Sequence, residues 1–214
     1  MILEEYSEFP KYVLRFLPEE QFICLKNNGI LSLKELKEYC YKNSAGGDSS
    51  RLNETEGGTE RRIIKEGIDV GQHDFPLEID VYMLCACLFN VNIEDMKGRF
   101  NTRYYVKIKD VKLLLKSIDN ALLKEKGYRK ERFESICQRV IYNKIDSYSK
   151  PAKVSGEYYE LFQEIIFQKP EYYQSECEFR FAFRRLDLDK ELDFKNHIKI
   201  KIDNFENIFE FHED

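Results

Sequence analysis

Residues 81–89 (VYMLCACLF) form a continuous apolar run, and this run limits the fold more than any other segment of the chain. A strand with one face in water alternates apolar and polar residues, whereas a strand covered on both faces needs apolar residues at every position. The run therefore predicts a central strand between two packed layers. We expect one α+β domain with a central antiparallel or mixed sheet and helices packed around it.

Other segments predict the neighbours of this strand. Residues 11–17 and 103–108 alternate as strands, and residues 179–183 (FRFAF) do the same near the C-terminus. Pro18 suits a helix start, so we expect a helix over 19–27 that ends at Asn28-Gly29. Asp110 is a predicted N-cap for a helix to about residue 125. Further expected elements are strands at 30–33, 139–142 and 197–202, helices at 33–42 and 158–167, and a turn-like segment at 90–99.

Length and composition agree with a single packed domain over residues 1–214. Hydrophobic residues make up 43% of the chain, with 16 Phe and 14 Tyr as bulky core material. The net charge of −5 disfavours an extensive nucleic-acid surface. No run of about 18 apolar residues predicts a membrane span, and the scattered cysteines favour a reducing cytoplasm. Residues 43–62 are rich in Gly, Ser, Asn and Thr, which predicts a long flexible loop.

Several familiar sites have no counterpart in the sequence. The chain has no phosphate-binding GxxxxGK[ST] loop, no GxGxxG after a strand and no HExxH pair. Cys85 and Cys87 lack a second cysteine pair and a nearby histidine, so a zinc site is not expected. The acidic residues between 187 and 193 lack the spacing of a calcium loop. We therefore expect no bound metal.

The strongest candidate site is the alternating stretch at the end of FQKPEYYQSECEFRFAF (residues 167–183). On a strand, Glu176, Glu178 and Arg180 point to one face and the intervening Cys177 and Phe179 to the other. Two carboxylates two residues apart on a strand lie roughly 6.5–7 Å from each other, so one substrate can touch both. Such a pair stabilises positive charge on a sugar carbon and positions a nucleophile. The alternative is a water-facing strand with Arg180 as a local ion-pair partner.

This pattern is similar to that of the mono-ADP-ribosyltransferase fold. There, an Arg on the first strand helps to hold NAD, and the second Glu of a C-terminal Glu-x-Glu contacts the nicotinamide ribose. The resemblance implies that Arg15 holds NAD, that Glu178 is the catalytic carboxylate and that Glu176 orients a macromolecular acceptor. It also sets a geometric requirement, because Arg15 and Glu178 must then face one cleft.

The chain also resembles an uncharacterised family of bacterial and phage proteins. The shared order is an Arg/Asp/Glu-Gly loop, a Cys-containing apolar strand, a V-x-I-x-D strand and helix, and K-P-x-x-Y followed by [EQ]-x-E-[FY]-R. Here these elements fall at Arg51 to Glu56-Gly57, residues 81–89, residues 106–110 and residues 169–180.

The loop offers a second set of candidate residues. Arg51 is expected to bind an anionic group of the ligand, and Glu56 to orient Arg51 or contact a hydroxyl. The alternative is a mobile insertion whose charges keep it in water. For the whole chain two functions remain open: an NAD-dependent ADP-ribosyltransferase with a toxin or phage–host role, and a non-catalytic interaction protein of the same family.

Overall fold

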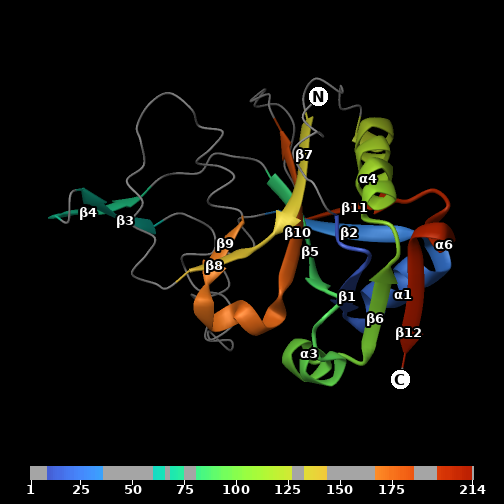
Figure 1. The fold of residues 1–214 in the computed structure, drawn as a ribbon. Coiled ribbons are helices and arrows are strands. Elements are labelled where there is room, and N and C mark those ends of the chain that lie inside the picture. The colour runs from blue at the N-terminus through green and yellow to red at the C-terminus, as the bar shows by residue number, and fades with distance from the viewer. Residues whose placement is uncertain are drawn as a thin grey trace.

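The structure is a computed structural model, and it describes residues 9–35, 60–65, 68–74, 81–126, 133–143, 167–185 and 197–213. These residues form an antiparallel sheet of eight strands with helices packed against it (Figure 1). The predicted α+β class is confirmed at this level. The eight strands are β1 (Val13–Leu17), β2 (Ile30–Glu35), β5 (Val81–Leu88), β6 (Tyr104–Ile108), β7 (Phe133–Arg139), β10 (Glu178–Arg185), β11 (His197–Lys201) and β12 (Phe209–Glu213).

Strand β5 is the centre of the sheet, as its apolar run predicts. It pairs antiparallel with β10 from Val81 to Cys87, and this pairing occupies one edge of the strand. A strand has two edges, so β1 and β2 share the other edge. Strand β1 pairs near the end of β5, where Leu14 lies opposite Cys87, and β2 pairs near its start, where Lys34 lies opposite Met83. The sheet thus forks at β5 into a β1–β6–β12 branch and a β2–β11 branch.

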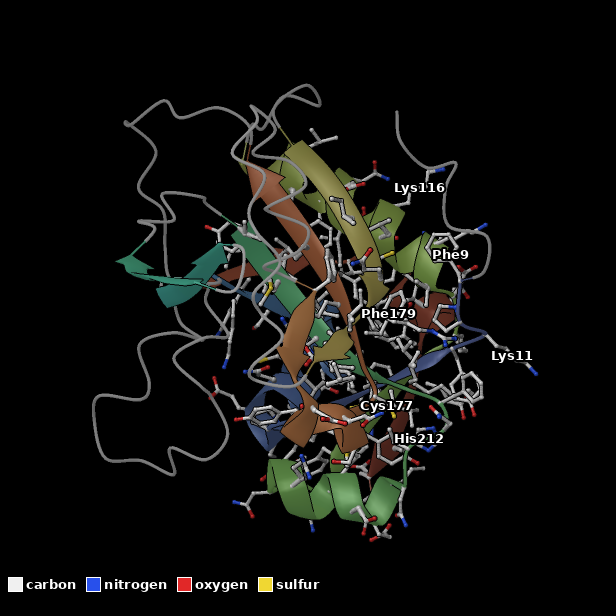
Figure 2. All side chains as sticks on the ribbon, turned by 60° about the vertical axis from the view of Figure 1, so that its left-hand side comes forward. Phe9, Lys11, Lys116, Cys177, Phe179 and His212 are labelled. Carbon is white, nitrogen blue, oxygen red and sulfur yellow. The ribbon has the colours of Figure 1, made fainter. Side chains whose placement is uncertain are left out.

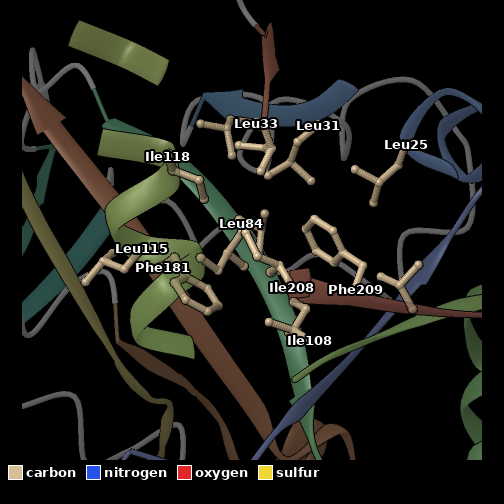
Figure 3. Packing of buried hydrophobic residues seen from close by; sticks show 14 of the residues in the cluster. Leu25, Leu31, Leu33, Leu84, Ile108, Leu115, Ile118, Phe181, Ile208 and Phe209 are labelled. Atoms are coloured by element: carbon tan, nitrogen blue, oxygen red, sulfur yellow. The ribbon is translucent and has the colours of Figure 1, made fainter. Parts of the chain in front are cut away.

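The two faces of the sheet differ in character. Residues directly opposite in register share a face, and successive residues alternate. The face that we call the core face carries Val13, Leu84, Val106 and Phe181, all completely buried. Figure 3 shows Phe181 and Leu84 beside Leu115 and Ile118 of the covering helix. The opposite face carries Glu178, Cys87 and Leu14 in one cross-strand row.

Among the described elements, three helices cover the core face: α1 (Glu19–Asn28), α4 (Val111–Lys126) and α6 (Phe205–Ile208). The predicted N-cap of α4 is confirmed, because Asp110 Oδ1 accepts a hydrogen bond from Leu113 N at 2.9 Å. The predicted end of α1 is confirmed too. Gly29 adopts φ 65°, and its N–H bonds to the carbonyl oxygen of Leu25 at 2.9 Å. A left-handed residue ends a helix in this way, and glycine adopts that conformation without steric cost.

Helix α3 (Ile93–Phe100) lies where the sequence predicted a turn-like segment, so that prediction is wrong. Only Met96 of this helix is buried, so its other positions can be polar and the apolar pattern of a helix is weak. Helical signals are nevertheless present. Asn92 Oδ1 accepts hydrogen bonds from the N–H groups of Glu94 and Asp95 at 3.0 and 3.3 Å. These two acidic residues occupy the first turn, where the helix dipole favours them.

Other boundaries also change. Strand β2 extends to Glu35, so a helix does not begin at Leu33. Residues 60–62 belong to β3 (Glu60–Lys65), which pairs antiparallel with β4 (Ile68–Asp74), so the expected loop does not extend to residue 62. The strand expected at 139–142 divides into the end of β7 and the short strand β8 (Ile141–Asn143), which pairs parallel with β9 (Gln168–Pro170). Residues 36–42, 43–59 and 158–166 lie outside the described part of the chain.

Five cysteines in the described ranges carry free thiols. Cys87 and Cys137 are buried, while Cys24, Cys85 and Cys177 are half-buried. Burial, with a smaller contribution from Asp119, raises the pKa of the Cys137 thiol to about 12. Among the residues that the structure describes, no helix is long and apolar enough to cross a membrane.

Candidate functional site

Glu178 and Arg180 form a closed ion pair on the opposite face of β10. Arg180 Nε donates to Glu178 Oε1 at 2.6 Å, and Arg180 Nη2 donates to Glu178 Oε2 at 3.1 Å. Both side chains are buried, with 1% of the Arg180 side chain and 6% of the Glu178 side chain exposed. This two-bond geometry is the strongest that a guanidinium and a carboxylate make. The ion pair of the alternative interpretation is confirmed, but the water-facing strand of that alternative is wrong.

The backbone on both sides of Glu178 is held as firmly as its side chain. Glu178 N donates to the hydroxyl oxygen of Tyr142 at 2.7 Å, and Glu178 O accepts from Val140 N at 2.9 Å. One residue earlier, the Cys177 carbonyl accepts from Leu88 N at 2.8 Å. The start of β10 is therefore fixed by β5 on one side and by residues 140–142 on the other.

Glu176 does not share the strand with Glu178. It ends a 3₁₀ helix, η4 (Glu171–Glu176), and Cys177 between the two carboxylates has φ 42°. A left-handed residue breaks the alternation that a strand would impose. Glu176 Oε1 instead accepts from Arg99 Nη1 of α3 at 3.2 Å, and only 9% of the Glu176 side chain is exposed. The prediction of two carboxylates projecting together from one strand is wrong.

Arg15 and Glu178 lie on different faces of the sheet. Glu178 is opposite Cys87, and Cys87 is opposite Leu14, so Leu14 shares the face of Glu178. Arg15 is the next residue of β1 and takes the core face. The Arg15 guanidinium reaches from β1 to β2, where Nη2 donates to the carbonyl oxygen of Ser32 at 3.1 Å. The single cleft that an NAD site with these residues requires is therefore not formed.

The remaining predicted site residues, Arg51 and Glu56, lie outside the described residues. The register places Cys85 of β5 and Gln138 of β7 directly beside Arg180 on the same face. Within the described ranges, no group of three or more histidine, cysteine, aspartate or glutamate side chains could hold a metal ion.

A second feature lies farther along the opposite face, on the β1–β6–β12 branch. Phe16, Tyr105 and His212 form one cross-strand row. The rings of Tyr105 and His212 stack at 4.5 Å with an interplanar angle of 2°, and Phe16 stacks on Phe100 of α3 at 5.6 Å with an angle of 10°. Figure 2 labels His212 above α3, near this end of the sheet.

Two further rings extend the row along β1. Tyr12 contacts Phe89 at a centroid distance of 5.4 Å. Phe89, which precedes α3, and Phe100, the last residue of α3, are 46% and 41% exposed. We call the six residues the aromatic surface: Tyr12, Phe16, Phe89, Phe100, Tyr105 and His212.

Cations lie over this surface and are paired with carboxylates. Lys97 Nζ lies 5.8 Å from the Tyr105 ring centre and 3.0 Å from Glu94 Oε1. Lys107 Nζ lies 4.9 Å from the Tyr12 ring centre and 3.0 Å from Glu210 Oε2. The hydrogen bond from Lys107 lowers the pKa of the Glu210 carboxyl.

The sequence does not predict the aromatic surface. Its members come from five separate segments, and the strand register brings Phe16, Tyr105 and His212 together. A usable signal was the α3 segment itself, where an Asn followed by two acidic residues and later by Lys97 and Arg99 has the charge order of a helix. Recognising that helix would have placed Phe100 beside the sheet.

Comparison of the chain with protein-family models, with curated protein sequences and with solved structures found no match.

Proposed function

We propose that this chain is an interaction protein and that the aromatic surface binds a protein partner. The observation that carries the proposal is the exposure of Phe89 and Phe100, at 46% and 41%, beside ordered aromatic neighbours. Clustered aromatic side chains at a surface are typical of interfaces, where large rings supply most of the binding energy.

The surface is suited to this role because its rings are already held in place. Phe16 and Tyr105 are fixed in the register of β1 and β6, and the stacked His212 and Phe100 extend them on both sides. A partner that docks here finds rings in fixed positions, so little side-chain freedom is lost on binding. Paired Lys97 and Lys107 at the same surface add polar groups around the rings.

A protein partner fits this surface better than a nucleic acid does. Bases stack on aromatic rings, but binding also requires cations that neutralise phosphates. Here Lys97 and Lys107 each lie 3.0 Å from a carboxylate oxygen, and the chain as a whole has a net charge of −5.

The Glu178–Arg180 pair has a structural role in this proposal. Both carboxylate oxygens accept hydrogen bonds from the guanidinium, so the group that a transferase would use is already bound. The opposite placement of Arg15 supports the same assignment. The pair fixes the start of β10 in the centre of the sheet.

Affinity capture with matched variants tests the proposal. The wild-type chain, the double variant Phe89→Ser/Phe100→Ser and the control Ile23→Ser serve as baits in lysate of the source cells. Ile23 is 46% exposed on α1, so its replacement removes comparable apolar surface elsewhere. Proteins retained by the wild type and by Ile23→Ser but lost by the double variant support the proposal. Identical retention by all three baits contradicts it.

A further inference from the structure

A groove separates helix α4 from the turn between β11 and α6. Its volume is about 560 Å³, which falls in the range of small-molecule sites. It lies on the core-face side of the sheet, because α4 covers that face, and so it is distinct from the aromatic surface. Figure 2 labels Lys116 on α4, well apart from His212.

The two walls of the groove are rigid. Helix α4 is anchored by Leu114 and Ile118, both fully buried. The opposite wall is held to its neighbours by backbone hydrogen bonds, in which Ile202 N donates to Gly29 O at 2.9 Å and Lys109 N donates to Ile208 O at 2.8 Å. Ile208 and Ala121, 1% and 5% exposed, form an apolar floor that is continuous with the core.

The groove is basic although the chain is acidic. Among the described residues, three lysines and one carboxylate line it, which gives a local charge of +2 against −5 for the chain. Lys116 and Lys124 are two helical turns apart on one face of α4, and Lys201 lies on the other wall. Three asparagine side chains in the same lining supply hydrogen-bond donors and acceptors.

One ion pair spans the groove, and an anionic ligand can replace its carboxylate. Lys124 Nζ lies 3.6 Å from Asp203 Oδ2, and the two side chains are 76% and 70% exposed. An exposed pair of this kind contributes little to stability, so a stronger anion can replace Asp203 as the partner of Lys124.

We propose that this groove binds a phosphorylated small molecule of nucleotide size. The ammonium groups of Lys116, Lys124 and Lys201 bind its phosphates, the asparagine amides bind its polar ring or sugar groups, and the floor at Ala121 and Ile208 receives its apolar part. This inference is independent of the aromatic surface.

Calorimetric titration of the full chain at about 150 mM salt tests the inference, with pyrophosphate, ADP and adenosine as probes. We expect ADP and pyrophosphate to bind and adenosine to bind far more weakly. Lys116→Glu should weaken ADP binding about tenfold or more, since it removes a charge-assisted contact and adds a repulsive charge. The control is Lys112→Glu, because Lys112 is exposed on the same helix but does not line the groove.

A third variant should change the affinity in the opposite direction. Asp203→Asn removes the competing carboxylate, so ADP should bind about twofold to fivefold more tightly. The inference is overturned if neither ADP nor pyrophosphate binds at concentrations up to about 10 mM. It is equally overturned if Lys112→Glu weakens binding as much as Lys116→Glu, or if adenosine binds as tightly as ADP.

Discussion

Arg180 Nε lies 2.6 Å from Glu178 Oε1, and both residues are buried two positions apart on β10, the strand between β5 and β7. The sequence pattern suggests that Glu178 is catalytic. In the structure its carboxylate is bound by Arg180 and holds a fixed position in the sheet. A buried pair is costly to break, because the remaining partner keeps its charge in a poorly solvated place. Glu178 therefore matters first for stability.

Glu178→Gln should lower the free energy of unfolding by about 3–5 kcal/mol, because it leaves the Arg180 guanidinium without its carboxylate. Urea unfolding followed by circular dichroism measures this change. Glu178→Leu combined with Arg180→Met should cost less than Glu178→Gln alone, since no buried charge then remains.

Glu176→Gln is the matched comparison. Its partner Arg99 is 31% exposed and can be solvated after the change, so the expected loss is about 1 kcal/mol. Equal losses of unfolding free energy for Glu178→Gln and Glu176→Gln would show that the buried pair stabilises the fold no more than the partly exposed pair does.

Gly29→Ala should destabilise the fold by at least about 1–2 kcal/mol. The residue has φ 65°, and an added Cβ would lie 2.5 Å from Phe205 Cδ1 and 2.9 Å from the Ile202 carbonyl oxygen. Thermal unfolding measures the effect, and Gly98→Ala on α3 is the control, because a Cβ there has no heavy atom within 4 Å. A melting temperature for Gly29→Ala equal to that of the control would contradict the packing of α1 against α6.

Cys137 should resist alkylation at pH 8.5, whereas Cys24 and Cys85 react. Burial raises the pKa of Cys137 to about 12, so its thiolate fraction at that pH is far smaller than that of an ordinary thiol. Iodoacetamide labelling followed by peptide mass spectrometry measures the modified fraction at each cysteine. Rapid labelling of Cys137 in the folded chain would show that this part of the core opens readily.

The chain should transfer no ADP-ribose from labelled NAD to proteins of a lysate. Arg15 and Glu178 lie on opposite faces, and the carboxylate of Glu178 is bound by Arg180. Label that appears with the wild type and disappears with a folded Glu178→Gln variant would restore the transferase hypothesis.

The elements that the sequence predicted correctly are those fixed by local chemistry. The apolar run of β5 requires cover on both faces, Gly29 ends α1, and Asp110 caps α4. The predictions that were wrong concern positions whose conformation depends on contacts with residues distant in the sequence. Alternation places Glu176 and Glu178 on one face, but the left-handed Cys177 breaks the strand between them.

Register also determines which residues form a site. A single sequence does not show that Leu14, rather than Arg15, lies in the row of Glu178. Nor does it show that Phe16, Tyr105 and His212 meet across three strands. Among the described residues, Arg15 and Glu178 of the predicted transferase site therefore lie on different faces of the sheet.

Site-specific photo-crosslinking tests the central claim most directly. A photoreactive phenylalanine analogue replaces Phe89 in one variant and Ile23 in another, since both positions are 46% exposed. After irradiation in the source cells, we expect a covalent adduct with a discrete protein partner from position 89 and none from position 23. Adducts from neither position, or the same adducts from both, would contradict a role for the aromatic surface in partner binding.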